Sequence, residues 1–109
     1  MRHVAGQLTE PVLLILLGLV DNPHHGYALM KEIETLSNGR VRLSTGTLYG
    51  ALRRLLQDGW IARFEQADTS RDKQAYRLTS AGRSQLHHEL DRMKQLTEAA
   101  IGRLRTHKA

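Results

Sequence analysis

Residues 43–59 read LSTGTLYGALRRLLQDG, and this stretch decides the fold. Ser44 is a favoured N-cap residue, and Gly59 can adopt the left-handed conformation that commonly closes a helix. Between these two signals, three leucines recur at helical spacing on one face, namely Leu48, Leu52 and Leu55. The pattern predicts a helix from Thr45 to about Asp58 with one side in a core.

The opposite side of this predicted helix is polar and basic. It presents Gly46, Tyr49, Gly50, Arg53, Arg54 and Gln57. Small residues let a helix backbone approach a partner closely, and the hydroxyls of Ser44, Thr45 and Thr47 can meet phosphates or base edges. An arginine such as Arg53 can fork onto a guanine edge or a phosphate. The same pattern also fits an ordinary surface helix with a solvated basic face, and periodicity alone leaves both interpretations open.

Two shorter helices are expected upstream. The first follows the N-cap candidate Thr9 and contains the nine-residue apolar run 12–20. That run is about half the length of a bilayer span, so it predicts a buried helix. A turn at 24–26 precedes a second helix from about residue 27 to 36, and the alternation in 40–43 predicts a short strand.

A hairpin and one long helix are expected downstream. Residues 60–64 and 73–78 read as two strands joined by a polar loop, which is the pattern of a β-hairpin. From Thr79 onward, apolar residues recur every three or four positions as Leu86, Leu90, Met93, Leu96, Ala100, Ile101 and Leu104. A helix of about 25 residues exceeds what so small a domain can cover, so we predict that this stripe forms a homodimer interface.

The predicted elements follow the order helix, helix, short strand, helix, hairpin and long helix. Three helices followed by a hairpin are typical of the winged helix-turn-helix, in which the third helix enters the DNA major groove. The predicted fold class is therefore mainly α with a small β-hairpin. Residues 1–79 are expected to form the winged helix-turn-helix DNA-binding domain, and residues 80–109 the C-terminal dimerisation helix.

The distribution of charge indicates a polyanionic partner. The 109 residues carry a net charge of +5, and residues 40–63 hold five arginines against one aspartate. A basic block of this kind is expected where a protein contacts nucleic acid. Together with the helix at 45–58, it predicts double-stranded DNA as the partner and no role at a membrane.

The residue content argues against metal, cofactor and catalytic functions. There is no cysteine, which excludes a disulfide framework and a thiolate zinc site and fits a reducing cytoplasm, where we expect the protein to act. The six histidines include no pair at i, i+4, so no metal site and no cofactor are expected. No serine has a recognisable nucleophile setting, and no glycine-rich phosphate loop follows a strand, so we predict that the chain is not an enzyme.

Several segments carry a resemblance to a known family. They are Leu17-Gly18-Leu19, His25-Gly26-Tyr27, Leu43-Ser44-Thr45-Gly46-Thr47-Leu48-Tyr49, Leu52-Arg53-Arg54-Leu55, Asp58-Gly59-Trp60-Ile61 and Tyr76-Arg77-Leu78-Thr79-Ser80-Ala81-Gly82. With them, the chain resembles the PadR-family winged-helix transcriptional regulators over nearly its whole length. Its single long C-terminal helix is similar to that of the short subfamily, which lacks a larger C-terminal domain.

The resemblance implies a repressor that dimerises through its last helix together with its first and binds a near-palindromic operator. It implies that the third helix enters the major groove while the hairpin touches the flanking backbone or minor groove. The expected DNA-binding residues are Tyr27, Lys31, Ser44, Thr45, Thr47, Tyr49, Arg53, Arg54, Arg71 and Lys73. Arg63 is expected to matter less than Arg53, because it belongs to the first strand of the hairpin rather than to the groove helix.

Three departures from the family pattern concern the helix start and the hairpin. The family usually has proline where this chain has Thr45 and Gly50, and a glycine-containing turn where this chain has residues 67–70. Gln74 and Ala75 stand where basic and aromatic residues are common. These differences weaken the expectation of contacts from the hairpin more than of contacts from the helix.

Two matters stay open at this level. Family relatives commonly release DNA when a small aromatic compound binds near the dimer centre. Residues 79–109 contain no Trp, Tyr or Phe, so recognition of such a compound by stacking on this helix is not expected, and an effector of another kind stays an open alternative. The alternative function is a winged-helix module for protein–protein association without DNA binding, since a fold can persist while its function changes.

Overall fold

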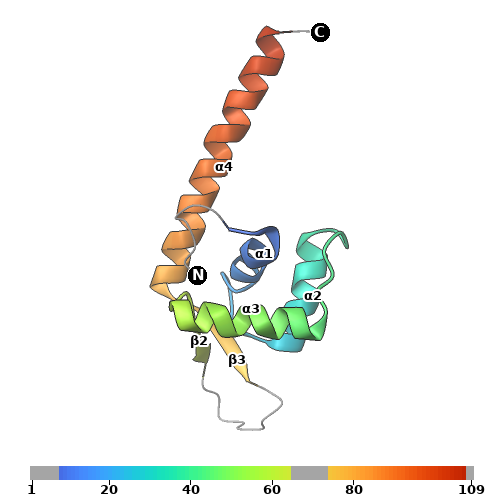
Figure 1. Ribbon diagram of the computed structural model, residues 1–109, viewed down its shortest axis with the longest axis vertical. Coiled ribbons are helices and arrows are strands. Elements are labelled where there is room, and N and C mark those ends of the chain that lie inside the picture. Colours follow the sequence, from blue (N-terminus) through green and yellow to red (C-terminus); the bar gives the residue numbers. More distant parts are fainter. Residues whose placement is uncertain (1–7, 65–73, 108–109) are drawn as a thin grey trace.

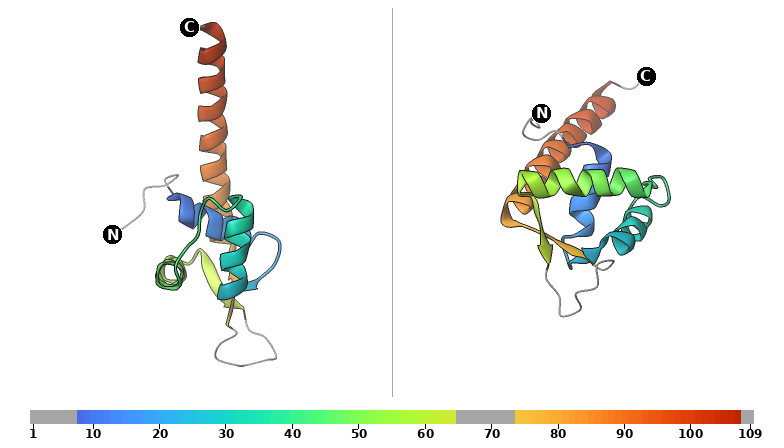
Figure 2. Two further views of the ribbon diagram at one scale, coloured as in Figure 1. Left: turned by 90° about the vertical axis from the view of Figure 1, so that its right-hand side faces the viewer. Right: turned by 60° about the horizontal axis from the view of Figure 1, so that its bottom comes forward.

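A computed structural model of the chain describes residues 8–64 and 74–107. Its elements are α1 (Glu10–Gly18), β1 (His24–His25), α2 (Gly26–Leu36), α3 (Thr45–Asp58), β2 (Ile61–Phe64), β3 (Ala75–Leu78) and α4 (Ser80–Thr106). The first three helices and the sheet gather into one body, and α4 leaves this body as a rod (Figures 1 and 2). The mainly α fold with a small β-hairpin and a long C-terminal helix is thereby confirmed.

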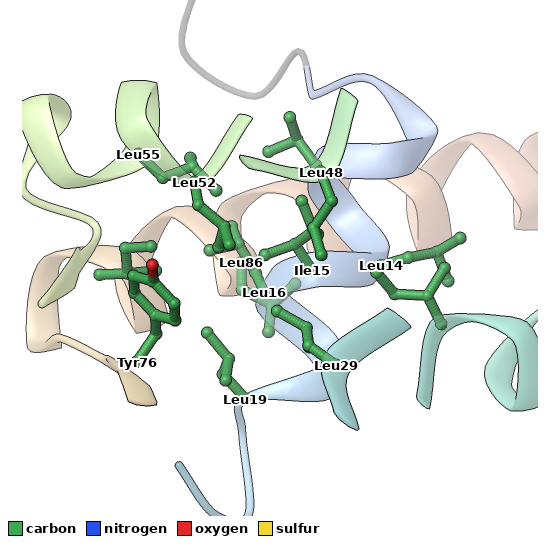
Figure 3. Packing of buried hydrophobic residues seen from close by; sticks show 13 residues of the cluster. Leu14, Ile15, Leu16, Leu19, Leu29, Leu48, Leu52, Leu55, Tyr76 and Leu86 are labelled. Carbon is green, nitrogen blue, oxygen red and sulfur yellow. The ribbon is translucent and has the colours of Figure 1, made fainter. Parts of the chain in front are cut away.

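The core is built around α1. Thr9 caps this helix by accepting a hydrogen bond from the Val12 backbone N–H at 3.3 Å. α1 is apolar on nearly every side and packs against α2 and α4, so that Ile15 and Leu16 are fully buried. Their side chains meet leucines of α2 and α3 in a single cluster (Figure 3). This arrangement confirms the buried helix that the apolar run predicts.

α3 has the bounds that the sequence predicts. Ser44 Oγ accepts a hydrogen bond from the Thr47 backbone N–H at 3.1 Å, and Gly59 ends the helix with a φ of +79°. The three leucines of its apolar face, Leu48, Leu52 and Leu55, are at most 1% exposed. One face of α3 is therefore fixed in the core.

The sheet corrects one prediction. Its three antiparallel strands lie in the order β1-β3-β2, and the β2–β3 hairpin is confirmed. The third strand, however, is His24–His25 rather than the segment 40–43. That segment pairs with none of the described strands. Its alternation reflects instead the partial burial of Val41 and Leu43, which pack against the core cluster.

α4 starts against the turn between α3 and β2. Thr79 Oγ1 accepts a hydrogen bond from the Gly82 N–H at 3.0 Å and donates one to the Gly59 carbonyl at 2.7 Å. Gly82 lies so close to this turn that a Cβ there would stand 2.0 Å from the carbonyl oxygen of Trp60. This close approach fixes the direction in which α4 leaves the body.

The first part of α4 packs against the body, and the rest is exposed. Leu86 and Glu89 are only 5% and 2% exposed, because they face the body. From residue 90 to 106, every residue is exposed. Leu86 therefore lies in the core of its own chain (Figure 3). This corrects its place in the predicted dimer stripe, because Leu86 has almost no surface left for a partner.

Candidate nucleic-acid interface

The open face of α3, formed by Gly46, Gly50, Arg53 and Arg54, combines two glycines with two arginines. Both arginines are exposed, and the helical period places them on either side of the strip that holds the glycines. A Cβ added at either glycine would meet no described atom within 4 Å, and neither glycine has a positive φ. The fold therefore does not require glycine at these two positions. Their effect is to leave the helix backbone open to close approach.

The hydroxyls at the start of α3 divide into two kinds. Ser44 Oγ donates to Thr47 Oγ1 at 2.9 Å in addition to capping the helix, so it acts mainly within the chain. Thr45 and Thr47 are exposed on the first turn. An anion that approaches this helix N-terminus would meet their side chains together with the first backbone N–H groups.

α2 adds two of the predicted residues beside α3. Tyr27 is exposed, and the Lys31 ammonium lies 5.5 Å from its ring centroid. The side chain of Tyr49, on α3, lies against the start of α2. A Cβ at Gly26 would stand 2.2 Å from the Tyr49 hydroxyl oxygen. A side chain at position 26 would therefore require the Tyr49 ring to move.

A cleft of about 400 Å³ separates α3 from the hairpin. Arg53 lines it from α3 and Arg63 lines it from β2. The rings of Tyr49 and Tyr76, the side chain of Gln74 and an apolar side made by Leu52 and Leu56 complete the lining. The cleft therefore offers cations, aromatic rings and apolar surface together.

Arg63 has a larger place in the site than the sequence pattern indicates. It lies opposite Tyr76 in the strand register, its guanidinium carbon is 6.0 Å from that ring centroid, and its Nη1 donates to Gln74 Oε1. The alternation of β2 carries the overlooked signal, because Arg63 shares a sheet face with the buried Ile61, and that face packs on α3. Arg63 thus faces the same cleft as Arg53.

One arginine of the basic block 40–63 is engaged within the chain. Arg40 forms an ion pair with Glu10 through two hydrogen bonds, one of them 3.0 Å long. These bonds hold the pKa of the Glu10 carboxyl below its ordinary value. The charge of Arg40 is therefore matched within the chain. Arg71 and Lys73, predicted for the hairpin, lie outside the described residues.

The outer part of α4 carries an open apolar stripe. Its large side chains are between 37% and 73% exposed, and they are Leu90, Met93, Leu96, Ile101 and Leu104, with the smaller Ala100 also exposed. Where the stripe meets the body, the buried Glu89 accepts hydrogen bonds from Arg92 Nε at 3.0 Å and Nη2 at 2.7 Å. These bonds hold the pKa of Glu89 below its ordinary value. Glu89 was not predicted as buried, although its spacing three residues after Leu86 places it on the apolar side.

The described surface offers a ligand cations, hydroxyls and aromatic rings. Within residues 8–64 and 74–107, no three His, Cys, Asp or Glu side chains gather where they could hold a metal ion. No helix in this part of the chain is long and apolar enough to cross a membrane.

The sequence is similar to one known protein family and to individual known proteins. The profile of a family described as "Transcriptional regulator PadR-like family" matches residues 13–88. A transcriptional regulator of Mycobacterium tuberculosis is 36% identical over 90 residues, which cover 83% of this chain and 81% of that protein. A 37.1 kDa protein from a Streptomyces fradiae transposon is 39% identical over 85 residues, or 78% of this chain. The chain spans only 23% of the length of that second relative.

Solved structures share the fold. A PadR family regulator from Clostridium difficile R20291 matches with a TM-score of 0.72 at 21% identity, covering 88% of this chain and 99% of that one. Bacillus subtilis PadR, solved in complex with operator DNA, matches with a TM-score of 0.63 at 23% identity, covering 73% of this chain and 46% of that one. At these identities, the likeness concerns the fold alone.

Proposed function

Because this chain belongs to the PadR-like family of transcriptional regulators, we propose that it binds double-stranded DNA as a homodimer. In this proposal, it acts in the cytoplasm, without a cofactor, as a repressor at a near-palindromic operator. Residues 1–79 form the DNA-binding domain, and residues 80–109 form the dimerisation helix. The family is one of transcriptional regulators and not of enzymes.

The observation that carries the proposal is the open face of α3. A helix about 10–12 Å across fits a major groove about 12 Å wide, provided that the side chains at its deepest point are small. Gly46 and Gly50 meet that condition. Arg53 and Arg54 then flank the deepest point, where a guanidinium group can fork onto a guanine edge or a phosphate.

The surroundings of α3 supply contacts to the DNA backbone in this proposal. Tyr27 and Lys31 of α2 support phosphates beside the groove, and Thr45 and Thr47 meet a phosphate at the N-terminus of α3. Ser44 contributes by fixing the start of the helix, and Tyr49 by its ring at the edge of the cleft. Arg71 and Lys73 serve the hairpin, as the family resemblance implies.

The open stripe of α4 supports the homodimer. A large apolar side chain that stays in water forgoes roughly 1.5–3 kcal/mol of the stabilisation that full burial provides. Leu90, Met93, Leu96, Ala100, Ile101 and Leu104 would be covered by the same stripe of a second copy. A two-fold axis would then set the two α3 helices about one DNA turn, roughly 34 Å, apart.

A gel shift on random duplex DNA, at about 50 mM and again at about 200 mM salt, tests the proposal. If two subunits neutralise about 6–10 phosphates, affinity should fall about 10³–10⁵-fold between the two conditions. Footprinting on the promoter of the protein's own gene and its neighbours then supplies the operator. No shift at low salt, or an affinity that barely changes with salt, would overturn the proposal and favour a module for protein–protein association.

Arg53→Ala sharpens this test. On the operator it should cost about 1–3 kcal/mol. If Arg53 contacts a base, the preference at one position of each half-site should relax, whereas a phosphate contact alone would leave the preference unchanged. The matched control is Arg105→Ala, which removes the same charge from the far end of α4. If Arg53→Ala and Arg105→Ala lost the same affinity on every DNA sequence, only the overall positive charge would matter, and α3 would not read bases.

A further inference from the structure

We propose that the cleft between α3 and the hairpin holds one phosphate of the DNA backbone, bound between Arg53 and Arg63. This rests on the proposed function, because it takes a duplex on α3 as given. It deepens that function by assigning a contact to Arg63, which lies on β2 and outside the groove helix.

Two cations from separate elements line this cleft. Arg53 comes from α3 and Arg63 from β2, and none of the described residues that line the cleft is acidic. Among the residues that the structure describes, no carboxylate of the lining matches either charge. Guanidinium groups on opposite sides of a cleft are well suited to a phosphate, whose oxygens can accept hydrogen bonds from both sides.

Arg63 is held in place while its charge is kept. Its Nη1 donates to the amide oxygen of Gln74, which is a neutral acceptor. A guanidinium group has five N–H donors in a rigid fork, so one bond to Gln74 leaves most of them for a second acceptor. The Tyr76 ring lies 6.0 Å from the guanidinium carbon and supports it from one side. A side chain held in this way loses less freedom when it binds.

The shape of DNA brings a phosphate to this place. The sugar–phosphate backbone forms the ridge between the major and the minor groove. With α3 in the major groove and the hairpin directed at the minor groove, that ridge crosses the space between the two elements. This space is the cleft. The partly exposed Leu56 on its apolar side can face a deoxyribose while the two arginines face the phosphate.

The first test compares Arg63→Gln with Arg77→Gln on operator and random duplexes. Arg77 is exposed on the same hairpin but pairs with Ala62, so it lies on the opposite sheet face and is a matched control. Losing one of the two cations at this phosphate in each of two subunits should lower the slope of log affinity against log salt, by at most about 1.8. Affinity should fall about tenfold or more per half-site, and equally on both duplexes, because a backbone contact carries no sequence information. Arg77→Gln should keep the parent slope, and Arg63→Lys should retain most of it.

The second test locates the contact on DNA. In a series of operators, each with one phosphate replaced by a neutral methylphosphonate, the parent protein should lose affinity at one position between the two grooves of each half-site. Arg63→Gln should be less sensitive than the parent at that position, where only Arg53 still contacts the phosphate, and unchanged elsewhere. Full sensitivity of Arg63→Gln at every position, or equal slopes for Arg63→Gln and Arg77→Gln, would overturn the inference while leaving DNA binding intact.

Two further outcomes separate this inference from its premise. Inorganic phosphate, added at constant ionic strength, could displace DNA from the parent but not from Arg63→Gln. If the two proteins then also showed the same methylphosphonate pattern, the cleft would bind free phosphate rather than a DNA phosphate, and the inference would be wrong. If the parent bound no duplex at all, the proposed function itself would fail first.

Discussion

The inner and outer parts of α4 share one apolar side but differ in what covers it. In the inner part, residues 80–89, this side packs against the body, and Gly82, Leu86 and Glu89 are buried on it. In the outer part, residues 90–106, the same side continues with every residue exposed. The periodicity does not change at the boundary. A regular apolar pattern therefore indicates that a surface is built for burial, but not which molecule buries it.

The largest effect is expected from charges placed on the outer part. Leu96→Asp combined with Leu104→Asp should separate the homodimer and lower operator affinity about 10²–10⁴-fold, because each half-site then binds alone. Both side chains are more than 60% exposed in the single chain, so the separated chains should keep their fold. Sedimentation gives the mass, and a gel shift gives the affinity.

A matched pair of charges controls this experiment. Gln95→Asp combined with Thr106→Asp adds the same charge to the opposite side of α4 and should change neither mass nor affinity. If the Leu96 and Leu104 variant stayed dimeric, the outer part would have to be regarded as an ordinary solvated surface.

A smaller effect is expected at the boundary. Glu89→Gln should lower the free energy of unfolding by about 1–2 kcal/mol at pH 7, because the charge and one of the two acceptor oxygens that bind Arg92 are replaced by a neutral NH2 donor. The pKa of Glu89 is lowered in the folded chain, chiefly by the hydrogen bonds from Arg92, so its stabilisation is present above the ordinary value of 4.5. It disappears as pH falls through the lowered pKa. Urea unfolding should therefore show the two proteins converging below about pH 4.5.

The exposed Glu98 supplies the comparison for this boundary. Glu98→Gln on the outer part should have nearly the same urea midpoint as the parent protein at each pH from 7 to 3, since the residue is exposed. Parallel curves for Glu89→Gln and the parent protein down to pH 3 would mean that the boundary carboxylate does not support the fold.

The smallest effect is expected on α3, which, like α4, has a covered surface and an open one: its leucines lie in the core, and its glycines and arginines are open. Gly50→Ala should raise the free energy of unfolding by about 0.5–1 kcal/mol, because alanine favours the helix and meets open space here. It should at the same time weaken DNA binding several-fold. Gly102→Ala, on the side of α4 away from the apolar stripe, should give the gain in stability without the loss of affinity. A stabilised Gly50→Ala that bound DNA as tightly as the parent would show that the backbone does not approach DNA closely.

The parts of the fold that could be predicted have their causes close together in the sequence. α3 begins at a Ser44 cap and ends at Gly59 with its leucines between, and α4 follows the Thr79 cap. Each of these signals acts within one turn of the residue it controls. The arginines of the open face could be predicted for the same reason, since their place follows from the helical period alone.

The parts that could not be predicted depend on distant residues. His24–His25 forms a strand because β3 lies beside it, about fifty residues later in the chain. Leu86 and Leu90 look alike in sequence, and only the packing of α4 against α1 separates a core residue from an exposed one. Arg63 gains its place in the cleft from Gln74 and Tyr76 across the hairpin, a pairing that needs the strand register.

The contact between Gly26 and Tyr49 also limits how this sequence can change over evolutionary time. The hydroxyl of Tyr49 occupies the place of a side chain at position 26, so these two sites share one small volume. A lineage that acquires alanine at position 26 must therefore either move the Tyr49 ring or acquire a smaller residue at position 49. Recombinants that take α2 and α3 from different parents should accordingly be less stable where a side chain at position 26 displaces the Tyr49 ring, and unaffected where the two positions are exchanged as a pair.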